Sequence, residues 1–137
     1  MSRTVLCDPT GVHVRCLIVD DNPGFLQAAC RILEGGGINV VGVASTGSEA
    51  LRRARELKPD VVLVDIDLGP ESGFDLAAQL TSNGDAPVPT VILISTHAEQ
   101  DFADLIADSP AAAFVSKADL SAAAIEDVLR KRGADVG

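Results

Sequence analysis

The chain has 137 residues, of which 47% are hydrophobic, and its 20 acidic and 11 basic side chains give a formal net charge of −9. This length and composition fit one globular domain with its own core and argue against intrinsic disorder. The acidic balance argues against direct nucleic-acid binding through this domain, because phosphate backbones are bound by clustered Lys and Arg. No stretch approaches the roughly 20 apolar residues of a membrane span. We therefore expect a cytoplasmic protein that does not bind membranes.

Five short runs rich in Val, Ile and Leu predict β-strands, since each is too short for a helix and is bounded by polar residues or glycine. The runs are apolar at nearly every position instead of alternating. This pattern indicates strands that are buried on both faces of a parallel sheet. The predicted strands are Arg15–Val19, 38–43, 61–64, 90–94 and 112–115.

A helix is predicted after each strand. Asn22 and Pro23 are typical of a helix start, and the apolar stripe that follows ends at the glycines of 35–37. Two further starts resemble capping boxes, in which a hydroxyl residue precedes an acidic residue by three positions. These pairs are Thr46 with Glu49 and Ser72 with Asp75; a fourth helix is predicted around Phe102, Leu105 and Ile106, and a fifth from Ser121 to Arg132.

The alternation of strands and helices predicts an α/β fold, (βα)5, with a doubly wound five-stranded parallel sheet between two helix layers. We expect the flavodoxin-like strand order 2-1-3-4-5. The domain should span residues 14–132, with an extension at 1–13 and a tail at 133–137. In such sheets, binding sites form at the carboxyl ends of the strands.

Carboxylates follow two of the predicted strands. Asp20 and Asp21 leave the first strand, while Asp65 leaves the third and Asp67 comes two residues later. Clustered carboxylates repel one another, so this arrangement favours a shared cation, and oxygen ligands suit Mg²⁺.

A hydroxyl and a cation follow the last two strands. Ser95 ends the fourth strand, and Lys117 follows the fifth. A metal, an ammonium and a hydroxyl together stabilise a phosphoryl group in transfer, and a carboxylate can accept that group. Asp65 is the natural acceptor.

These residues resemble the receiver domains of two-component response regulators, the CheY-like superfamily. The resemblance runs from about residue 14 to residue 132, nearly the whole chain. It is carried by five motifs: LIVDDNP at 17–23, VLVDIDL at 62–68, SGF at 72–74, VILIS at 91–95 and FVSK at 114–117.

The resemblance implies that Asp65 accepts a phosphoryl group from a sensor histidine kinase. It implies that Asp20, Asp21, Asp65 and the backbone carbonyl of Asp67 hold Mg²⁺, and that Lys117 contacts the phosphoryl oxygens. The chain would then be a signalling domain and not an enzyme, although autophosphorylation from small phosphodonors and autodephosphorylation would fit such a site.

The resemblance also implies a switch. Ser95 and Phe114 match the pair that rearranges on phosphorylation, and the fourth helix, fifth strand and fifth helix would form the surface read by a downstream protein or by a second copy of the chain. Asp67 and His97 match positions that tune the lifetime of the phosphoryl group. Ala118 departs from the pattern, because proline usually follows the lysine.

Three alternatives remain open. One is a receiver-like interaction module that works without phosphorylation. Another is a metal-dependent phosphohydrolase of the haloacid dehalogenase type, because Asp65 and Asp67 form a DxD motif, although that family carries the motif on its first strand. A toprim-like nuclease module would also use DxD, but it needs a Glu after its first strand, where this chain has Asp20.

Overall fold

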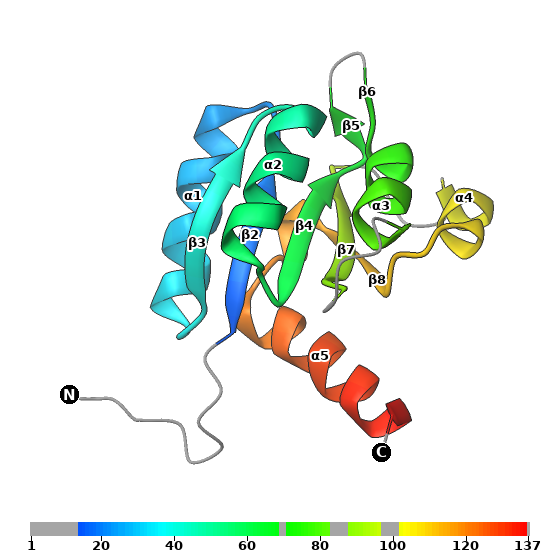
Figure 1. Cartoon of the computed structure of the whole chain (residues 1–137). Coiled ribbons are helices and arrows are strands. Elements are labelled where there is room, and N and C mark those ends of the chain that lie inside the picture. The colour runs from blue at the N-terminus through cyan, green and yellow to red at the C-terminus, as the bar shows by residue number, and fades with distance from the viewer. Residues whose placement is uncertain (1–13, 69–70, 83–87, 97–101, 137) are drawn as a thin grey trace.

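The computed structural model describes residues 14–136 except 69–70, 83–87 and 97–101 (Figure 1). Five parallel strands form one sheet in the order β3-β2-β4-β7-β8. In chain order this is 2-1-3-4-5, so the predicted flavodoxin-like order is confirmed. The strands are β2 (Arg15–Val19), β3 (Asn39–Ala44), β4 (Val61–Asp65), β7 (Thr90–Ser95) and β8 (Ala113–Ser116).

The three central strands, β2, β4 and β7, are buried almost throughout, whereas the edge strands β3 and β8 are largely half-buried. Burial on both faces explains why the central strands are apolar at successive positions. Val62 and Val64 of β4 pack into one hydrophobic cluster, while Val61 and Leu63 pack into a second. The strand that ends at Asp65 is therefore held from both sides.

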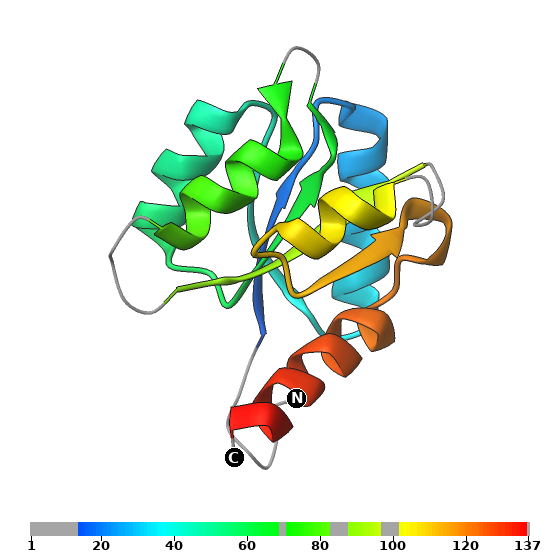
Figure 2. The same ribbon diagram turned by 90° about the vertical axis from the view of Figure 1, so that its right-hand side faces the viewer.

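Helices cover both faces of the sheet, as predicted (Figures 1 and 2). Side chains of α1 and α5 pack in the cluster on one face, and side chains of α2, α3 and α4 pack in or against the cluster on the other. The helices are α1 (Pro23–Gly35), α2 (Gly47–Leu57), α3 (Gly73–Ser82), α4 (Ala103–Asp108) and α5 (Ala122–Val136). None of the helices in the described part of the chain is long and apolar enough to cross a membrane.

The predicted helix starts are confirmed at α1, α2 and α3. The Asn22 side chain accepts hydrogen bonds from the backbone N–H groups of Gly24 and Phe25. Thr46 Oγ1 accepts one from the Glu49 backbone at 3.1 Å. Ser72 Oγ accepts one from the Phe74 backbone at 3.2 Å. Each cap satisfies a donor that the first helical turn would otherwise leave unpaired.

The fold differs from the prediction in two places near the site. Strands β5 (Asp67–Leu68) and β6 (Glu71–Ser72) form an antiparallel hairpin directly after β4, and a 3₁₀ turn, η2 (Lys117–Asp119), follows β8. Two-residue strands and single turns carry no hydrophobic periodicity, so no sequence pattern predicted them.

The fourth helix is short. α4 has six residues, none of them buried, and Leu105 is 54% exposed. Phe102 and Ile106 pack against the core cluster that α2 and α3 share, and the Phe102 ring lies 6.3 Å from the Phe74 ring of α3, centroid to centroid. Within the part of the chain that is described, the N-cap residue Phe102 and Ile106 of the helix itself thus provide its packing against that cluster.

Candidate functional site

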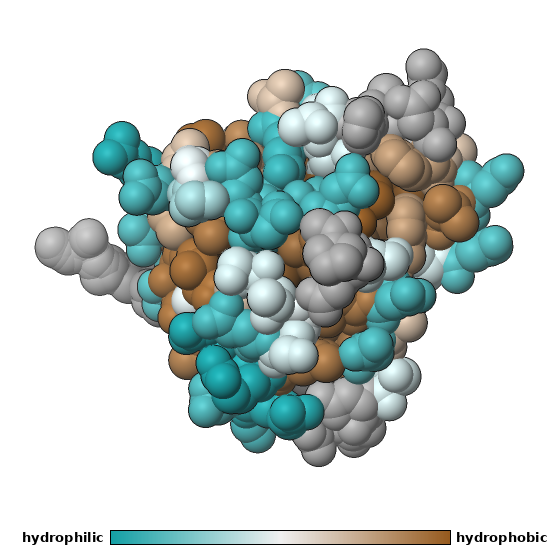
Figure 3. Space-filling model, turned by 90° about the horizontal axis from the view of Figure 1, so that it is seen from above, coloured by the Kyte–Doolittle hydropathy of each residue, from teal (hydrophilic) through white to brown (hydrophobic). Residues whose placement is uncertain are grey.

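The strands of the main sheet end at one edge, and most of the predicted site residues that are described lie there. Figure 3 looks onto this edge and shows hydrophilic residues over much of the described surface. Asp20, Asp65, Ser95 and Lys117 lie at or directly after the ends of β2, β4, β7 and β8.

Asp20 follows β2 and is fully buried. Its Oδ1 accepts a hydrogen bond of 2.9 Å from the Asn22 backbone. Its Oδ2 accepts no hydrogen bond of ordinary geometry and is compensated by the ammonium of Lys117, 2.5 Å away. A fully buried carboxylate oxygen that accepts no hydrogen bond destabilises the fold. Such an oxygen therefore points to a role in binding a ligand.

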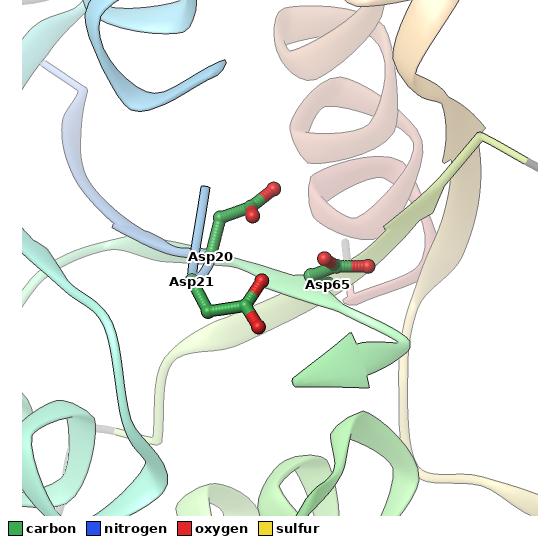
Figure 4. Close-up of side chains that lie close together, drawn as sticks. All are labelled: Asp20, Asp21 and Asp65. Atoms are coloured by element: carbon green, nitrogen blue, oxygen red, sulfur yellow. The ribbon is translucent and has the colours of Figure 1, made fainter. Parts of the chain in front are cut away.

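Asp20, Asp21 and Asp65 come together as predicted (Figure 4). One oxygen of each carboxylate lies within 4.8 Å of the others, and Asp21 is the exposed member of the group. Three carboxylates in this arrangement offer the hard oxygen donors that Mg²⁺ prefers, and the exposed side leaves room for the waters that Mg²⁺ keeps. The residues present therefore fit a magnesium ion.

Asp65 is the last residue of β4 and is 5% exposed. Burial raises the pKa of its carboxyl group to about 6, and the negative charge of Asp20 adds to this increase. A 3.0 Å hydrogen bond from the Asp67 backbone N–H to Oδ1 and the charge of Lys117 act in the opposite direction. The backbone hydrogen bond fixes Oδ1, while Oδ2 faces the lysine.

Lys117 is the first residue of η2 and is the cation of the site. Its Nζ lies 3.3 Å from Asp65 Oδ2 and 2.5 Å from Asp20 Oδ2, and its side chain is 13% exposed. Burial alone would lower the pKa of this ammonium, but contacts with Asp20 and Asp65 outweigh burial and raise it. Lys117 is therefore held in its charged form between the two strand ends.

Gly73, the first residue of α3, packs against the backbone at the end of β4. A Cβ at this position would lie 2.2 Å from the backbone oxygen of Asp65 and 2.7 Å from the Cα of Ile66. The Gly73 N–H donates a hydrogen bond of 2.9 Å to the Ile66 carbonyl. The lack of a side chain at residue 73 thus lets α3 begin directly beside Asp65.

Ser95 and Phe114 lie on neighbouring strands. Ser95 is 2% exposed at the end of β7 and pairs in register with Ser116 of β8, the residue before Lys117. Phe114 is half-buried and packs against the core cluster on the α3 side of the sheet. The side chain of Asp67 is exposed, while His97 lies outside the described residues.

Sequence reasoning missed two residues of the site. In the sequence, Gly73 stands out only as part of the SGF motif at 72–74, and Phe25 is one apolar residue in the stripe that follows Pro23. In the structure the Lys117 Nζ lies 4.4 Å from the centroid of the Phe25 ring. No local sequence signal identifies either role. The role of Phe25 depends on how α1 approaches Lys117, more than 90 residues away, and the role of Gly73 depends on how α3 packs against Asp65.

A family model described as "Response regulator receiver domain" matches residues 16–130. The chain is 35% identical over 121 residues to a protein-glutamate methylesterase/protein-glutamine glutaminase of Idiomarina loihiensis. This match covers 87% of this chain and 29% of that protein. It is 33% identical over 105 residues to response regulator GacA of Pseudomonas viridiflava, and this match covers 76% of this chain and 48% of that protein. The chain thus spans less than half the length of these two relatives.

Among solved structures, the signal receiver domain of a NarL response regulator from Mycobacterium tuberculosis superposes with a TM-score of 0.73 at 30% identity. The superposition covers 85% of this chain and 96% of the NarL chain. The match therefore extends over almost the whole of that receiver domain.

Proposed function

The chain belongs to the response regulator receiver domain family of two-component systems, and from this premise we propose that Asp65 accepts a phosphoryl group from the phosphohistidine of a sensor histidine kinase. The observation that carries the proposal is the position of the buried Asp65 carboxylate. It lies beside both a carboxylate cluster able to hold a divalent cation and the ammonium of Lys117. A receiver-like module that worked without phosphorylation would have no need of this complete set.

Magnesium would be held by Asp20, Asp21, Asp65 and the backbone carbonyl of Asp67. When bound, the ion supplies positive charge against the developing charge of the phosphoryl oxygens. Two observations support this. One oxygen of each of the three carboxylates lies within 4.8 Å of the others. Asp20 Oδ2 is buried beside the ammonium of Lys117 but accepts no well-formed hydrogen bond.

Asp65 acts as the nucleophile. One of its carboxylate oxygens forms a bond to phosphorus while the bond between phosphorus and the donor's imidazole nitrogen breaks, and the imidazole leaves with that electron pair and takes a proton from solvent. The carboxyl pKa of about 6 keeps most of the group ionised above pH 7, so no general base is needed. Lys117, whose ammonium lies 3.3 Å from Asp65 Oδ2, would stabilise the charge on the phosphoryl oxygens.

Ser95 and Phe114 would pass the change to the surface. The phosphoryl group adds negative charge and acceptor oxygens that attract the Ser95 hydroxyl, and Phe114 then repacks in the space behind it. The surface of α4, β8 and α5 would be read by a downstream protein or by a second copy of the chain. Asp67 and His97 would set the lifetime of the phosphoryl group. The protein would act in the cytoplasm, where histidine kinases have access to ATP.

Intact-mass spectrometry tests this function. The protein is incubated with Mg²⁺ and acetyl phosphate, and separately with Mg²⁺ and the phosphorylated domain of a histidine kinase. We expect one phosphoryl adduct on the wild type and none on Asp65→Asn or in EDTA.

The matched control is Asp75→Asn, which removes an exposed carboxylate on α3 and should leave the adduct intact. Lack of an adduct with both donors would refute the proposal and favour an interaction module that works without phosphorylation. An adduct that persists in Asp65→Asn would place the acceptor elsewhere.

A further inference from the structure

Phe25 contacts the cation of the site through the face of its ring. It is the third residue of α1, and the centroid of its ring lies 4.4 Å from Lys117 Nζ. Part of the ring packs against the core cluster of α1 and α5, so it is half-buried. An ammonium at this distance is attracted electrostatically by the negative face of an aromatic ring.

The contact between Phe25 and Lys117 completes a closed chain of interactions that begins and ends at Asp20. Asp20 Oδ1 accepts a hydrogen bond from the Asn22 backbone at 2.9 Å. Asn22 Oδ1 in turn accepts one from the Phe25 backbone at 3.2 Å. The Phe25 ring then contacts Lys117, and Lys117 pairs with Asp20 Oδ2. The cap of α1 thus brings both the ring and the carboxylate into contact with the same ammonium.

We propose that Phe25 is a positioning residue for Lys117, holding the ammonium where it meets the phosphoryl oxygens on Asp65. The role in phosphoryl transfer rests on the proposed function. The contact between the ring and the ammonium does not, since it is made before any phosphoryl group arrives.

The chemical nature of the ring explains why it suits this task. Asp20 and Asp65 hold Lys117 by pairing with its charge, and each pairing reduces the positive charge that the ammonium can offer to a phosphoryl group. The ring attracts the ammonium without carrying a charge of its own, and it also shields that side of the group from water. A leucine at position 25 would fill similar space but would exert no such attraction.

The test replaces Phe25 with mono-, di- and trifluorophenylalanine by site-specific incorporation. Fluorine withdraws electron density from the ring face while changing its size little, so packing and cation attraction are separated. We expect the rate of phosphoryl-adduct formation from acetyl phosphate to fall stepwise, by about fivefold at the trifluoro variant, while the midpoint of thermal unfolding stays constant.

The same series at Phe74, whose ring packs against the Phe102 ring, is the matched control and should leave the rate unchanged. A rate that is flat across the Phe25 series while the wild type is phosphorylated would overturn the proposal. A fall in both series would also overturn it, because fluorination would then act through packing.

A second measurement keeps failure of the proposed function distinct. In the unphosphorylated protein, the ring current of Phe25 should shift the Lys117 ε-proton NMR signals upfield, and Phe25→Leu should abolish that shift. If the wild type accepts no phosphoryl group but the shift is present and lost in the variant, the proposed function fails and the ring–ammonium contact stands. If the signals are the same in both proteins, the positioning role is refuted whatever the adduct assay gives.

Discussion

Gly73 lies directly against the backbone of Asp65, so close that a methyl group at residue 73 would lie 2.2 Å from the Asp65 carbonyl oxygen. Real Cβ atoms do not approach backbone that closely. The atoms that the methyl group would meet belong to the backbone of Asp65 and Ile66, and not to the end of a flexible side chain. The backbone segment that carries Asp65 therefore keeps its position only while residue 73 has no side chain.

Gly73→Ala should slow phosphoryl-adduct formation from acetyl phosphate by at least about tenfold, since misplacement by an ångström is enough to lose that much rate. The measurement is the adduct rate at saturating Mg²⁺. Gly35→Ala is the matched control, because a Cβ at Gly35, the last residue of α1, would meet nothing within 4 Å. Equal rates in the two variants would mean that α3 can shift without disturbing Asp65.

Asp65→Asn should stabilise the magnesium-free protein at pH 8. Because the folded-state pKa of Asp65 is raised to about 6, the folded protein disfavours the ionised form, and this group lowers stability as the pH rises from about 4 through 6. Removing the charge should recover on the order of 1–2 kcal/mol at pH 8.

The gain should vanish below pH 4, where the carboxyl group is neutral in both states. Urea unfolding in EDTA at several pH values measures this difference. A variant that is less stable than the wild type at pH 8, or a difference that does not change with pH, would contradict the prediction.

Glu49 supports the start of α2. The Ser45 backbone N–H donates to Glu49 Oε1 at 2.9 Å, and this bond, together with that from Arg53, lowers the Glu49 pKa. Such a group stabilises the fold above its unfolded pKa and loses this contribution as the pH falls through its folded pKa. Glu49→Gln should therefore be less stable than the wild type at pH 7, and the two proteins should converge in acid.

Chemical denaturation at pH 7 and below pH 4 measures the effect of Glu49→Gln, with Glu56→Gln, an exposed position on the same helix, as the control. Thr46→Ala, which removes the neighbouring cap, should cost about 1 kcal/mol at both pH values. A pH-dependent loss in the Thr46 variant of the same size as that in Glu49→Gln would show that the two contacts are not separable.

Cys16 should be inert in the native state. Burial raises the pKa of its thiol to about 12, with a smaller contribution from Cys30, and the thiolate is the reactive form. Iodoacetamide at pH 8 should label Cys30, which is half-buried on α1, at least tenfold faster. Peptide mapping by mass spectrometry measures both rates, and in urea the two should become equal. Rapid native labelling of Cys16 would mean that β2 and α1 separate readily.

The architecture could be predicted because its signals are local. The runs of the central strands are apolar at successive positions, and the caps Asn22, Thr46 and Ser72 mark helix starts by residue type alone. The hairpin of β5 and β6 could not be predicted, since two-residue strands are set by the path of the chain after Asp65. The short α4 likewise depends on how Phe102 meets Phe74.

The candidate site divides in the same way. Asp20, Asp65 and Lys117 could be placed together from sequence because each follows a strand of one parallel sheet, and the geometry confirms that they meet. Their roles in phosphoryl transfer stay predictions. Phe25 and Gly73 escaped because an apolar residue in a helical stripe and a glycine after a serine have ordinary structural explanations. Only the approach of two helices to the strand ends gives them their positions.

The exposed surface of α4 has a consequence for the evolution of recognition. Its residues Asp104, Leu105 and Asp108 are exposed, while Ile106 and the N-cap residue Phe102 pack against the core. Replacements at the exposed positions would disturb neither hydrophobic cluster nor the strands that carry the carboxylates. New binding preferences can therefore accumulate on this helix one substitution at a time. Duplicated copies of the gene can then bind different partner proteins while the carboxylate site around Asp65 stays the same.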